Sequence, residues 1–478
     1  MTLPICSTED VRAAERACPR ELADGTLMAR AAMAVATEAI DMLHADGGVV
    51  GREVLLLVGA GDNGGDALFA GARLAARGVR VTAVALSSRM HEAAALAFRD
   101  AGGRVTDTPG ALMLLDRLAL AIDGIVGIGS SRPLEGDAAL LARALADAAI
   151  PTLAVDVPSG VHADTGAVAG AAVMAQRTIT FGALRRAHVI TPAALHCGDV
   201  HVADIGVPMP SRDAAVTTDA PWFEAPAPGL DKYARGVAGV VTGSLAFPGA
   251  AALSAGAAAR AGCGMVRHFG PMPHAVVAEH PEVVATTRSE IVQHPRTQAW
   301  LVGCGIGLDA DAADAVASVL AMTAPVVIDA DAITLLAAKP ALQQAVRART
   351  AHTVLTPHAG EAQRLALGLG VEIDLDTDRL GAAQALARSL DAVILLKGPT
   401  TIVTDGTRFL GTPPLGARLA TAGSGDVLAG ILVGALARWA PLPSVLELVA
   451  AGALRHARAA QEASLVASDL VRALDAGQ

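Results

Sequence analysis

The chain of 478 residues almost lacks three polar residue types. Its only lysines are Lys232, Lys339 and Lys397, its only asparagine is Asn63 and its only tyrosine is Tyr233. Arginine provides nearly all of the positive charge, although an arginine cannot replace a lysine where a compact point charge is needed. Where a chain that avoids a residue type still contains that residue, we expect the chemistry of the residue to be required. Asn63 and Lys397, which both follow predicted strands, are therefore candidate functional residues.

The chain also lacks the features of several protein classes. Its net charge of -10 argues against binding to nucleic acid. No apolar run reaches the length of a bilayer without a glycine or a charge, and residues 1–9 lack the basic and apolar segments of a signal peptide. The chain has five cysteines and no Cys-x-x-Cys pair among them: Cys6, Cys18, Cys197, Cys263 and Cys304. This pattern is typical of a protein in a reduced compartment and argues against a zinc site. We expect a cytoplasmic protein with no nucleic-acid or membrane partner.

Length and composition predict more than one domain. Hydrophobic residues make up 53% of the chain and aromatic residues only 2%, so large cores must be built mainly from Ala, Val and Leu. A chain of this length generally forms two or three domains. Residues 207–230 are rich in Pro, Ala and Asp and show no periodicity, which indicates a boundary. We predict one domain over residues 1–210 and a second over residues 225–478.

The first half has the pattern of a parallel sheet. Apolar positions at helical spacing predict two helices within residues 8–45. Residues 53–58 predict a buried strand, which leads into a Gly-rich turn at 59–66 and a helix that runs through Arg77. A further strand is predicted at 79–86. This order of strand, turn, helix and strand is a βαβ unit.

Polar side chains follow the predicted strands of the first half. Asn63 follows the first strand, Asp123 ends a strand at 118–123, and Asp156 and Ser159 follow a strand that begins at Thr152. Open α/β sheets bind ligands at the carboxyl ends of their strands. Oxygen atoms from separate strand ends suit a hard cation, whereas Asp123 and Asp156 could instead cap the turns or helices that follow. The residues alone leave both interpretations open.

The second half repeats this organisation. Strands followed by polar loops, and mostly by helices, predict a second doubly wound α/β domain with its site on one rim. The predicted strands lie at residues 237–242, 300–302, 325–328, 352–355 and 392–396, and a hairpin is predicted at 401–410.

The stretch Gly423-Ser424-Gly425-Asp426 stands before an apolar run, 427–439, that predicts a buried helix. Backbone amides at a helix start bind anions, and a carboxylate beside them suits a general base acting on a hydroxyl that meets a phosphoryl group. A Gly-rich loop with Asp426 as a helix cap is the alternative. In the same way, Lys397 suits a nucleotide phosphate or a solvated surface, and His358 suits a ligand or a helix cap.

The motifs of the first half resemble the NAD(P)H-hydrate epimerase family. That family carries Gly-x-Gly-Asn-Asn-Gly-Gly-Asp-Gly, and the chain has Gly59-Ala60-Gly61-Asp62-Asn63-Gly64-Gly65-Asp66-Ala67. The stretches Asp123-Gly124-Ile125-Val126-Gly127-Ile128-Gly129 and Asp156-Val157-Pro158-Ser159-Gly160 are similar to two later motifs of the family. The chain departs from the pattern at Asp62, which replaces the first Asn of the pair, and at Ala67, which replaces the last Gly.

The second half resembles the ADP- or ATP-dependent NAD(P)H-hydrate dehydratases, which have a ribokinase-like fold. Its matching segments are Gly243-Ser244 with Pro248-Gly249-Ala250, Thr356-Pro357-His358 with Gly360-Glu361, Lys397-Gly398, and Gly423-Ser424-Gly425-Asp426. Cys304 stands where that family usually has Pro between glycines. The two resemblances cover nearly the whole chain, in the order of a fused bifunctional repair enzyme.

The resemblance implies two doubly wound, three-layer α/β domains, the first Rossmann-like and the second ribokinase-like. It implies that the first interconverts the R and S hydrates of NADH and NADPH (NADHX and NADPHX). The second would dehydrate the S form with ADP or ATP and Mg²⁺, by phosphorylating the C6 hydroxyl and eliminating phosphate. A small-molecule kinase with a ligand-sensing N-terminal domain is one alternative, and a non-catalytic nucleotide sensor is another. We also expect a homo-oligomer.

The resemblance also implies roles for individual residues. Asp426 and Asp156 would be catalytic, and Asn63, Asp123 and Ser159 would hold a potassium ion. The hydrate-binding residues of the first half would be Asp62, Asn63, Gly64, Gly65, Asp66, Gly127, Ile128, Gly129, Ser130, Ser131, Arg132, Pro133 and Asp156. Those of the second half would be Ala250, Gly305, His358 and Asp426, and the nucleotide-binding residues would be Lys397, Gly398, Pro399, Thr400, Thr401 and Gly425.

Overall fold

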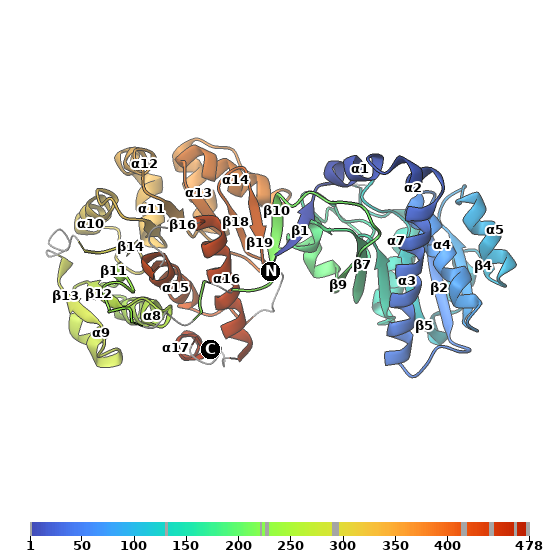
Figure 1. Cartoon of the computed structure of the whole chain (residues 1–478), viewed down its shortest axis with the longest axis horizontal. Coiled ribbons are helices and arrows are strands. Elements are labelled where there is room, and N and C mark those ends of the chain that lie inside the picture. Colours follow the sequence, from blue (N-terminus) through green and yellow to red (C-terminus); the bar gives the residue numbers. More distant parts are fainter. Residues whose placement is uncertain are drawn as a thin grey trace. The chain divides into compact units, whose positions relative to one another are not determined.

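The computed structural model describes residues 2–129, 132–219, 222–224, 229–288, 296–412, 418–438, 444–462 and 466–474. The chain forms two compact units (Figure 1). The first unit comprises Leu3–Asp213, and the second comprises Ala214–Gln478 together with the first two residues. Among the described residues, no helix combines the length and the apolar character needed to cross a bilayer.

The first unit contains a parallel sheet with the strand order β4-β3-β2-β5-β6-β7-β9. Its strands are β2 (Glu53–Val58), β3 (Arg80–Ala85), β4 (Arg104–Thr106), β5 (Leu118–Gly124), β6 (Thr152–Val155), β7 (Arg177–Phe181) and β9 (Asp199–Ala203). Outside this sheet, β1 (Thr2–Cys6) pairs in parallel with β8 (Leu184–Arg185). The helices are α1 (Thr8–Arg16), α2 (Pro19–Ala23), α3 (Thr26–Ala45), α4 (Asp62–Ala75), α5 (Glu92–Asp100), α6 (Thr108–Leu112) and α7 (Gly136–Asp147).

Helices cover both faces of this sheet, which explains why β2 is apolar from Val54 to Val58. Val54, Leu56 and Val58 pack in the core on the side of α3, α4 and α5. The alternating residues Leu55 and Leu57 pack in a second core, with residues of α6 and α7. A doubly wound α/β fold with three layers is therefore confirmed for the first half.

Two local predictions for this unit are wrong. Residues 8–45 form three helices instead of two, because Pro19 begins α2 and Gly25, with a φ of 77°, separates α2 from α3. The Gly-rich segment 59–66 is not a turn throughout, because α4 already begins at Asp62. Its glycines permit close packing: a Cβ on Gly59 would lie 1.7 Å from the carbonyl oxygen of Ile125, and one on Gly64 would lie 2.3 Å from that of Gly59.

The second unit contains a larger, mixed sheet with the order β13-β12-β11-β14-β15-β16-β17-β18-β19-β10. Seven neighbouring strands from β13 to β17 are parallel. They are β11 (Val237–Val241), β12 (Met265–Phe269), β13 (Val284–Thr286), β14 (Ala299–Val302), β15 (Val326–Ile328), β16 (Thr353–Leu355) and β17 (Val393–Leu396). The antiparallel hairpin β18 (Ile402–Thr404) and β19 (Phe409–Gly411) follows, and β10 (Asp213–Val216) pairs in parallel with β19.

Helices cover both faces of this sheet as well. The core on one face contains residues of α8 (Pro248–Arg260), α15 (Ser424–Arg438), α16 (Val445–Glu462) and α17 (Ala467–Ala473). Val276 of α9 (Pro273–Glu279) belongs to the same core. The remaining helices are α10 (Ala310–Leu320), α11 (Asp331–Ala338), α12 (Pro340–Arg347), α13 (Ala359–Leu369) and α14 (Arg379–Leu390). The strands that carry the predicted polar loops thus share one parallel sheet, and their carboxyl ends lie on one rim.

The segment before residue 225 belongs to the second unit. It supplies β10, and its Trp222 and Phe223 are buried in the same core as α15 and α16. Asp219 accepts hydrogen bonds from Arg455 and Arg458 of α16, at 3.4 and 2.8 Å. The second unit therefore begins at Ala214 instead of at residue 225, because this proline-containing segment is anchored by aromatic packing and ion pairs.

We predict that a fragment of residues 213–478 folds as a more stable unit than a fragment of residues 225–478. The shorter fragment loses β10 and two buried aromatic side chains, and truncating one buried Phe or Trp costs about 3–5 kcal/mol. Thermal unfolding followed by circular dichroism compares the two. Equal melting temperatures would show that residues 213–224 contribute nothing to this core.

Candidate functional site

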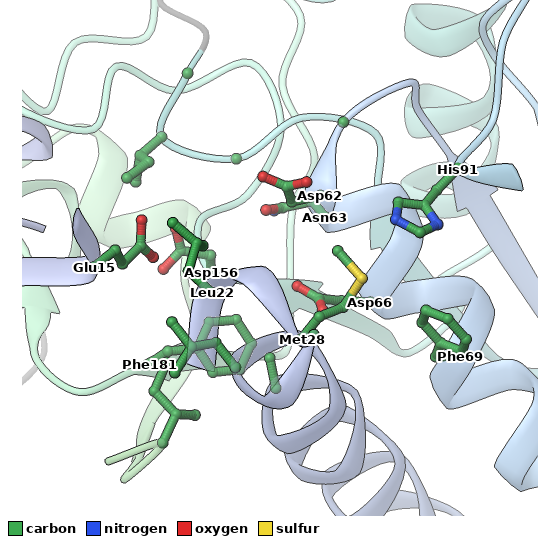
Figure 2. Close-up of a pocket in the computed structure, with 18 of the residues that line it drawn as sticks. Glu15, Leu22, Met28, Asp62, Asn63, Asp66, Phe69, His91, Asp156 and Phe181 are labelled. Atoms are coloured by element: carbon green, nitrogen blue, oxygen red, sulfur yellow. The ribbon is translucent and has the colours of Figure 1, made fainter. Parts of the chain in front are cut away.

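The first unit has a cavity of about 1220 Å³ at the carboxyl ends of its strands. Residues from α1, the α2–α3 region, α4 and the loops after β5 and β6 line it. Figure 2 shows acidic and apolar side chains among those that line it, together with Asn63 and His91. The labelled acidic ones are Glu15, Asp62, Asp66 and Asp156, and the labelled apolar ones are Leu22, Met28, Phe69 and Phe181.

Asp156 is fixed in this cavity by partners from β7 and β8. Its Oδ1 accepts a hydrogen bond from the Thr180 hydroxyl at 2.8 Å and lies 3.0 Å from Nη2 of Arg185. Arg185 is itself only 2% exposed and also donates to the carbonyl oxygens of Phe181 and Ala183. Because both contacts use Oδ1, Oδ2 of Asp156 remains for a ligand.

The backbone of Asp156 is also held in an uncommon conformation, with a φ of 67°. Its carbonyl oxygen lies 2.8 Å from Nε2 of His188, whose Nδ1 accepts a hydrogen bond from the Arg185 amide at 2.9 Å. Nε2 must therefore carry the proton and donate it to Asp156. Burial lowers the pKa of His188 to about 4, so this imidazole is neutral and acts as a fixed support.

Asp123 and Ser159 are in contact, and Asn63 lines the cavity close to the loops that carry them. The hydroxyl and amide of Ser159 each donate to the Asp123 carboxylate at 2.7 Å. The Asn63 amide nitrogen donates to the carbonyl oxygen of Val155 at 2.6 Å. Its oxygen lies against Gly127, where an added Cβ would be 2.4 Å from Oδ1.

The charge of Asp123 bears on whether this group could hold a cation. Asp123 is fully buried, and burial raises its pKa to about 6 despite the hydrogen bonds from Ser159 and Ile125. Among the described residues, no cationic side chain forms an ion pair with it. A buried carboxylate beside a serine hydroxyl offers oxygen atoms that a hard cation can bind.

The expected hydrate-binding residues of the first unit fall into three groups. Those that line the cavity are Asp62, Asn63, Asp66, Gly127, Ile128, Gly129, Arg132 and Asp156. Gly64 and Gly65 are buried outside this lining and shape the start of α4, and Pro133 lies near Gly170, where an added Cβ would be 2.8 Å away. Ser130 and Ser131 lie outside the described residues.

In the second unit, Lys397 lies at the end of β17 and faces two carboxylates, Asp329 after β15 and Glu361 in the first turn of α13. Its Nζ is 2.8 Å from Oδ1 of Asp329 and 3.8 Å from Oε2 of Glu361. Burial by itself lowers the pKa of Lys397, but these two carboxylates raise it above the ordinary value. The ammonium therefore stays charged, and Lys397 is not a solvated surface lysine.

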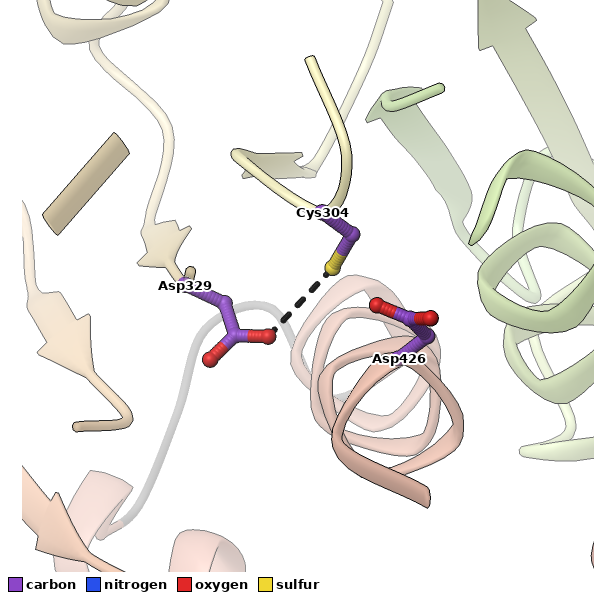
Figure 3. Close-up of side chains that lie close together, drawn as sticks. All are labelled: Cys304, Asp329 and Asp426. Carbon is purple, nitrogen blue, oxygen red and sulfur yellow. Dashed lines mark hydrogen bonds between the residues drawn. The ribbon is translucent and has the colours of Figure 1, made fainter. Parts of the chain in front are cut away.

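Asp426 lies in the first turn of α15, close to the same group. Figure 3 shows it opposite Asp329 and Cys304, and one ligand atom from each of the three residues lies within 4.8 Å of the others. The Cys304 thiol donates to Oδ2 of Asp329 at 3.4 Å. Burial, and then the charge of Asp329, raise the pKa of Asp426 to about 6. At neutral pH, Asp426 is a carboxylate that can accept a proton.

Glycines allow the start of α15 to approach Lys397. Gly423 has a φ of 85°, which favours glycine. A Cβ on Gly425 would lie 3.4 Å from Nζ of Lys397, so the start of α15 and the end of β17 meet here. Of the residues that follow Lys397, Gly398 and Pro399 are exposed and Thr400 is buried, while the Thr401 amide donates to the Thr412 hydroxyl at 3.3 Å.

The other hydrate-binding candidates of the second unit are Ala250, Gly305 and His358. Ala250 and Gly305 lie side by side, because a Cβ on Gly305 would be 3.0 Å from that of Ala250. His358 caps α13: its Nδ1 accepts from the amides of Gly360 and Glu361 at 3.0 and 3.4 Å. Its ring remains more than half exposed, so capping does not prevent it from contacting a ligand.

Arg185, Thr180 and Asp329 were not among the predicted site residues. Asp329 directly follows a predicted strand, so the rule that found Asp123 and Asp156 could have found it. Arg185 had no such signal, because nothing in its neighbourhood distinguishes it from the other arginines.

The comparisons with known proteins agree with this two-part organisation. The family described as YjeF-related protein N-terminus matches residues 24–187, and the family described as NAD(P)H-hydrate dehydratase matches residues 238–476. The fold and sites thus define a protein that joins these two kinds of α/β domain in one chain.

Full-length relatives have the same organisation. The chain is 44% identical to the bifunctional NAD(P)H-hydrate repair enzyme Nnr of Mycobacterium tuberculosis, over 91% of this chain and 89% of that protein. The enzymes of the same name from Mycobacterium leprae and Corynebacterium glutamicum are 43% and 39% identical, over 95% and 90% of this chain and 93% and 86% of theirs. The chain belongs to the family of bifunctional NAD(P)H-hydrate repair enzymes.

A similar solved structure is the ADP/ATP-dependent NAD(P)H-hydrate dehydratase from Bacillus subtilis, co-crystallised with ATP and Mg²⁺. It is 26% identical, with a TM-score of 0.45, and the match covers 52% of this chain and 91% of that chain.

We predict that potassium orders the loop after β5. The amide of Ile125 donates to Asp123 and that of Val126 donates to Ser159, so a cation bound to these oxygens should slow hydrogen exchange at both amides. Exchange in the full chain is compared in potassium chloride and in choline chloride of equal ionic strength. Identical exchange of residues 118–129 in the two salts would contradict a potassium site there.

Proposed function

We propose that the chain repairs hydrated NADH and NADPH. The first unit interconverts the R and S hydrates, and the second unit converts the S hydrate to NADH or NADPH with ADP or ATP. The family membership supports this two-part function, and it favours repair over a small-molecule kinase. The observation that carries the chemistry is the meeting of Asp426, Asp329 and Lys397 at one rim of the second sheet.

In the second unit, Asp426 accepts the proton of the C6 hydroxyl as the hydroxyl oxygen forms a bond to the transferred phosphorus. The bond from phosphorus to the nucleotide's bridging oxygen breaks, and its electrons leave with the nucleotide. Lys397 and the amides at the start of α15 stabilise the negative charge of the phosphoryl group. The C6–O bond then breaks with loss of phosphate and a ring proton, which restores the reduced nicotinamide.

Asp329 fixes the position of Lys397 in this scheme. It is 1% exposed and also accepts the Thr356 hydroxyl at 2.6 Å, so its carboxylate cannot turn away. Ala250, Gly305 and His358 are the hydrate-binding candidates. Lys397, Gly398, Pro399, Thr400, Thr401 and Gly425 are the nucleotide-binding candidates. Mg²⁺ would accompany the nucleotide and neutralise phosphate charge.

In the first unit, the cavity holds the hydrated ring near Asp156. Arg185 keeps the Asp156 carboxylate paired and oriented, with Oδ2 available to the ring. Asn63, Asp123 and Ser159 would hold potassium, which supplies positive charge beside the dinucleotide. The homo-oligomeric state and the cytoplasmic location stay predictions.

We predict that Asp426→Asn lowers dehydratase turnover by roughly two or more orders of magnitude while nucleotide binding survives. The base must be ionised, and its pKa is about 6, so wild-type kcat/KM should fall as the pH falls below about 6. The assay follows the reappearance of NADH absorbance from the S hydrate. Nucleotide binding is measured by calorimetry.

The matched control is Asp314→Asn, which makes the same change at an exposed position of α10. It should leave turnover and the pH profile unchanged. If Asp426→Asn keeps near-normal turnover and its kcat/KM still falls at low pH, Asp426 is not the base and has only a structural role in α15.

A further inference from the structure

Asp66 presents a buried carboxyl group that the proposed function does not yet use. It lies in the first turns of α4, lines the cavity and is 6% exposed. Its Oδ1 is inaccessible to solvent and has no hydrogen-bond partner. A buried polar atom without a partner is costly, so such an atom next to a ligand cavity indicates a group that a ligand completes.

The surroundings of Asp66 favour its protonated form. Three carboxylates act on it: Asp62 from the same helix, Asp156 from the loop after β6 and Glu15 from α1. Burial, and then these charges, raise the pKa of Asp66 well above its ordinary value. The cationic or titratable nitrogen groups that line the same cavity are Arg12, Arg73, His91, Arg132 and Arg185. Arg185 is committed to Asp156.

Asp156 lies in the opposite kind of environment. Its carboxylate is paired with a buried guanidinium and accepts a hydroxyl, whereas the carboxyl of Asp66 has like charges around it. Figure 2 shows the two groups on separate elements that border one cavity. Two carboxyl groups whose environments differ in this way can act as an acid and a base in one reaction.

We propose that Asp66 donates a proton to the C6 hydroxyl of the hydrate while Asp156 acts as the proton acceptor, so that the two residues interconvert the R and S forms. This proposal rests on the epimerase function proposed for the first unit. It assigns to Asp66 a catalytic role in addition to hydrate binding.

The steps balance without any further reactant. Asp66 gives its proton to the hydroxyl oxygen at C6, the C6–O bond breaks with its electrons on oxygen, and water leaves. The lone pair of the ring nitrogen forms a C6=N double bond, and the cation is stabilised by the Asp156 carboxylate. Water adds to the other face of C6 and gives a proton to Asp156. Protons return to Asp66 through water, or the next turnover runs in the opposite direction.

The apolar lining supports this scheme. Leu22, Met28 and Phe181 line the same cavity as the two carboxyl groups (Figure 2). Apolar side chains around a cationic intermediate limit the water that reaches it and strengthen its attraction to Asp156.

The test uses the full chain, an R/S mixture of NADHX and saturating ADP. Wild type should convert the S share first and then the R share, at a rate set by epimerisation. Asp66→Asn should slow conversion of the R share by about two orders of magnitude or down to the spontaneous rate, and leave the S share unaffected. Asp100→Asn, at an exposed position of α5, is the matched control and should behave as wild type.

The pH profile separates proton donation from a structural role. Epimerisation by wild type should fall at high pH as Asp66 loses its proton. Asp62→Asn removes a negative charge that raises the pKa of Asp66, so its high-pH limb should move to lower pH. Asp66→Asn should lack that limb in whatever activity remains.

The outcomes are distinguishable. If wild type never converts the R share faster than the spontaneous rate, the epimerase function itself fails. If wild type converts it but Asp66→Asn keeps the wild-type rate and profile, Asp66 is not the proton donor. If Asp66→Asn does not fold, the wild-type and Asp62→Asn profiles decide: the absence of a high-pH limb, or a limb unmoved by Asp62→Asn, overturns the proposal.

Discussion

Both units depend on carboxylates that are buried at the carboxyl ends of parallel strands and neutralised by a partner from another loop. A buried carboxylate without partners would lose several kcal/mol of hydration. Asp156 is compensated by Arg185, and Asp329 by Lys397. Asp123 is compensated by the hydroxyl and amide of Ser159. These pairs keep the groups fixed before any ligand arrives, which is the arrangement that catalysis by positioned charges requires.

Asp426, the proposed base, is a partly buried carboxylate whose charge is less fully balanced. Asp426 has the thiol of Cys304 and the charge of Asp329 beside it, and burial raises its pKa to about 6 (Figure 3). Burial, and then Asp329 and Asp426, raise the pKa of the Cys304 thiol well above its ordinary value, so it remains a hydrogen-bond donor to Asp329. The Cys304 thiol therefore holds Oδ2 of Asp329, while Lys397 and the Thr356 hydroxyl hold Oδ1.

The sequence predicted site residues that follow strands, but it did not predict contacts between residues far apart in the chain. A polar residue directly after an apolar strand marked Asp123, Asp156 and Lys397, because parallel strands must deliver such residues to one rim. The partners of these residues could not be predicted, since Lys397 is 68 positions away from Asp329 and its pairing depends on strand order. The start of α4 at Asp62 was also missed, because glycines that permit close packing look like glycines that form a turn.

The central claim is that two buried carboxylate sites in one chain cooperate on the two hydrate forms. The most direct measurement incubates an R/S mixture of NADHX with the wild-type chain and ADP or ATP, and follows NADH absorbance to completion. The account predicts that NADH is recovered from both shares faster than spontaneous epimerisation allows, with phosphate released in equal amount. Recovery that stops at the S share, or a stable phosphorylated product without NADH, would contradict it.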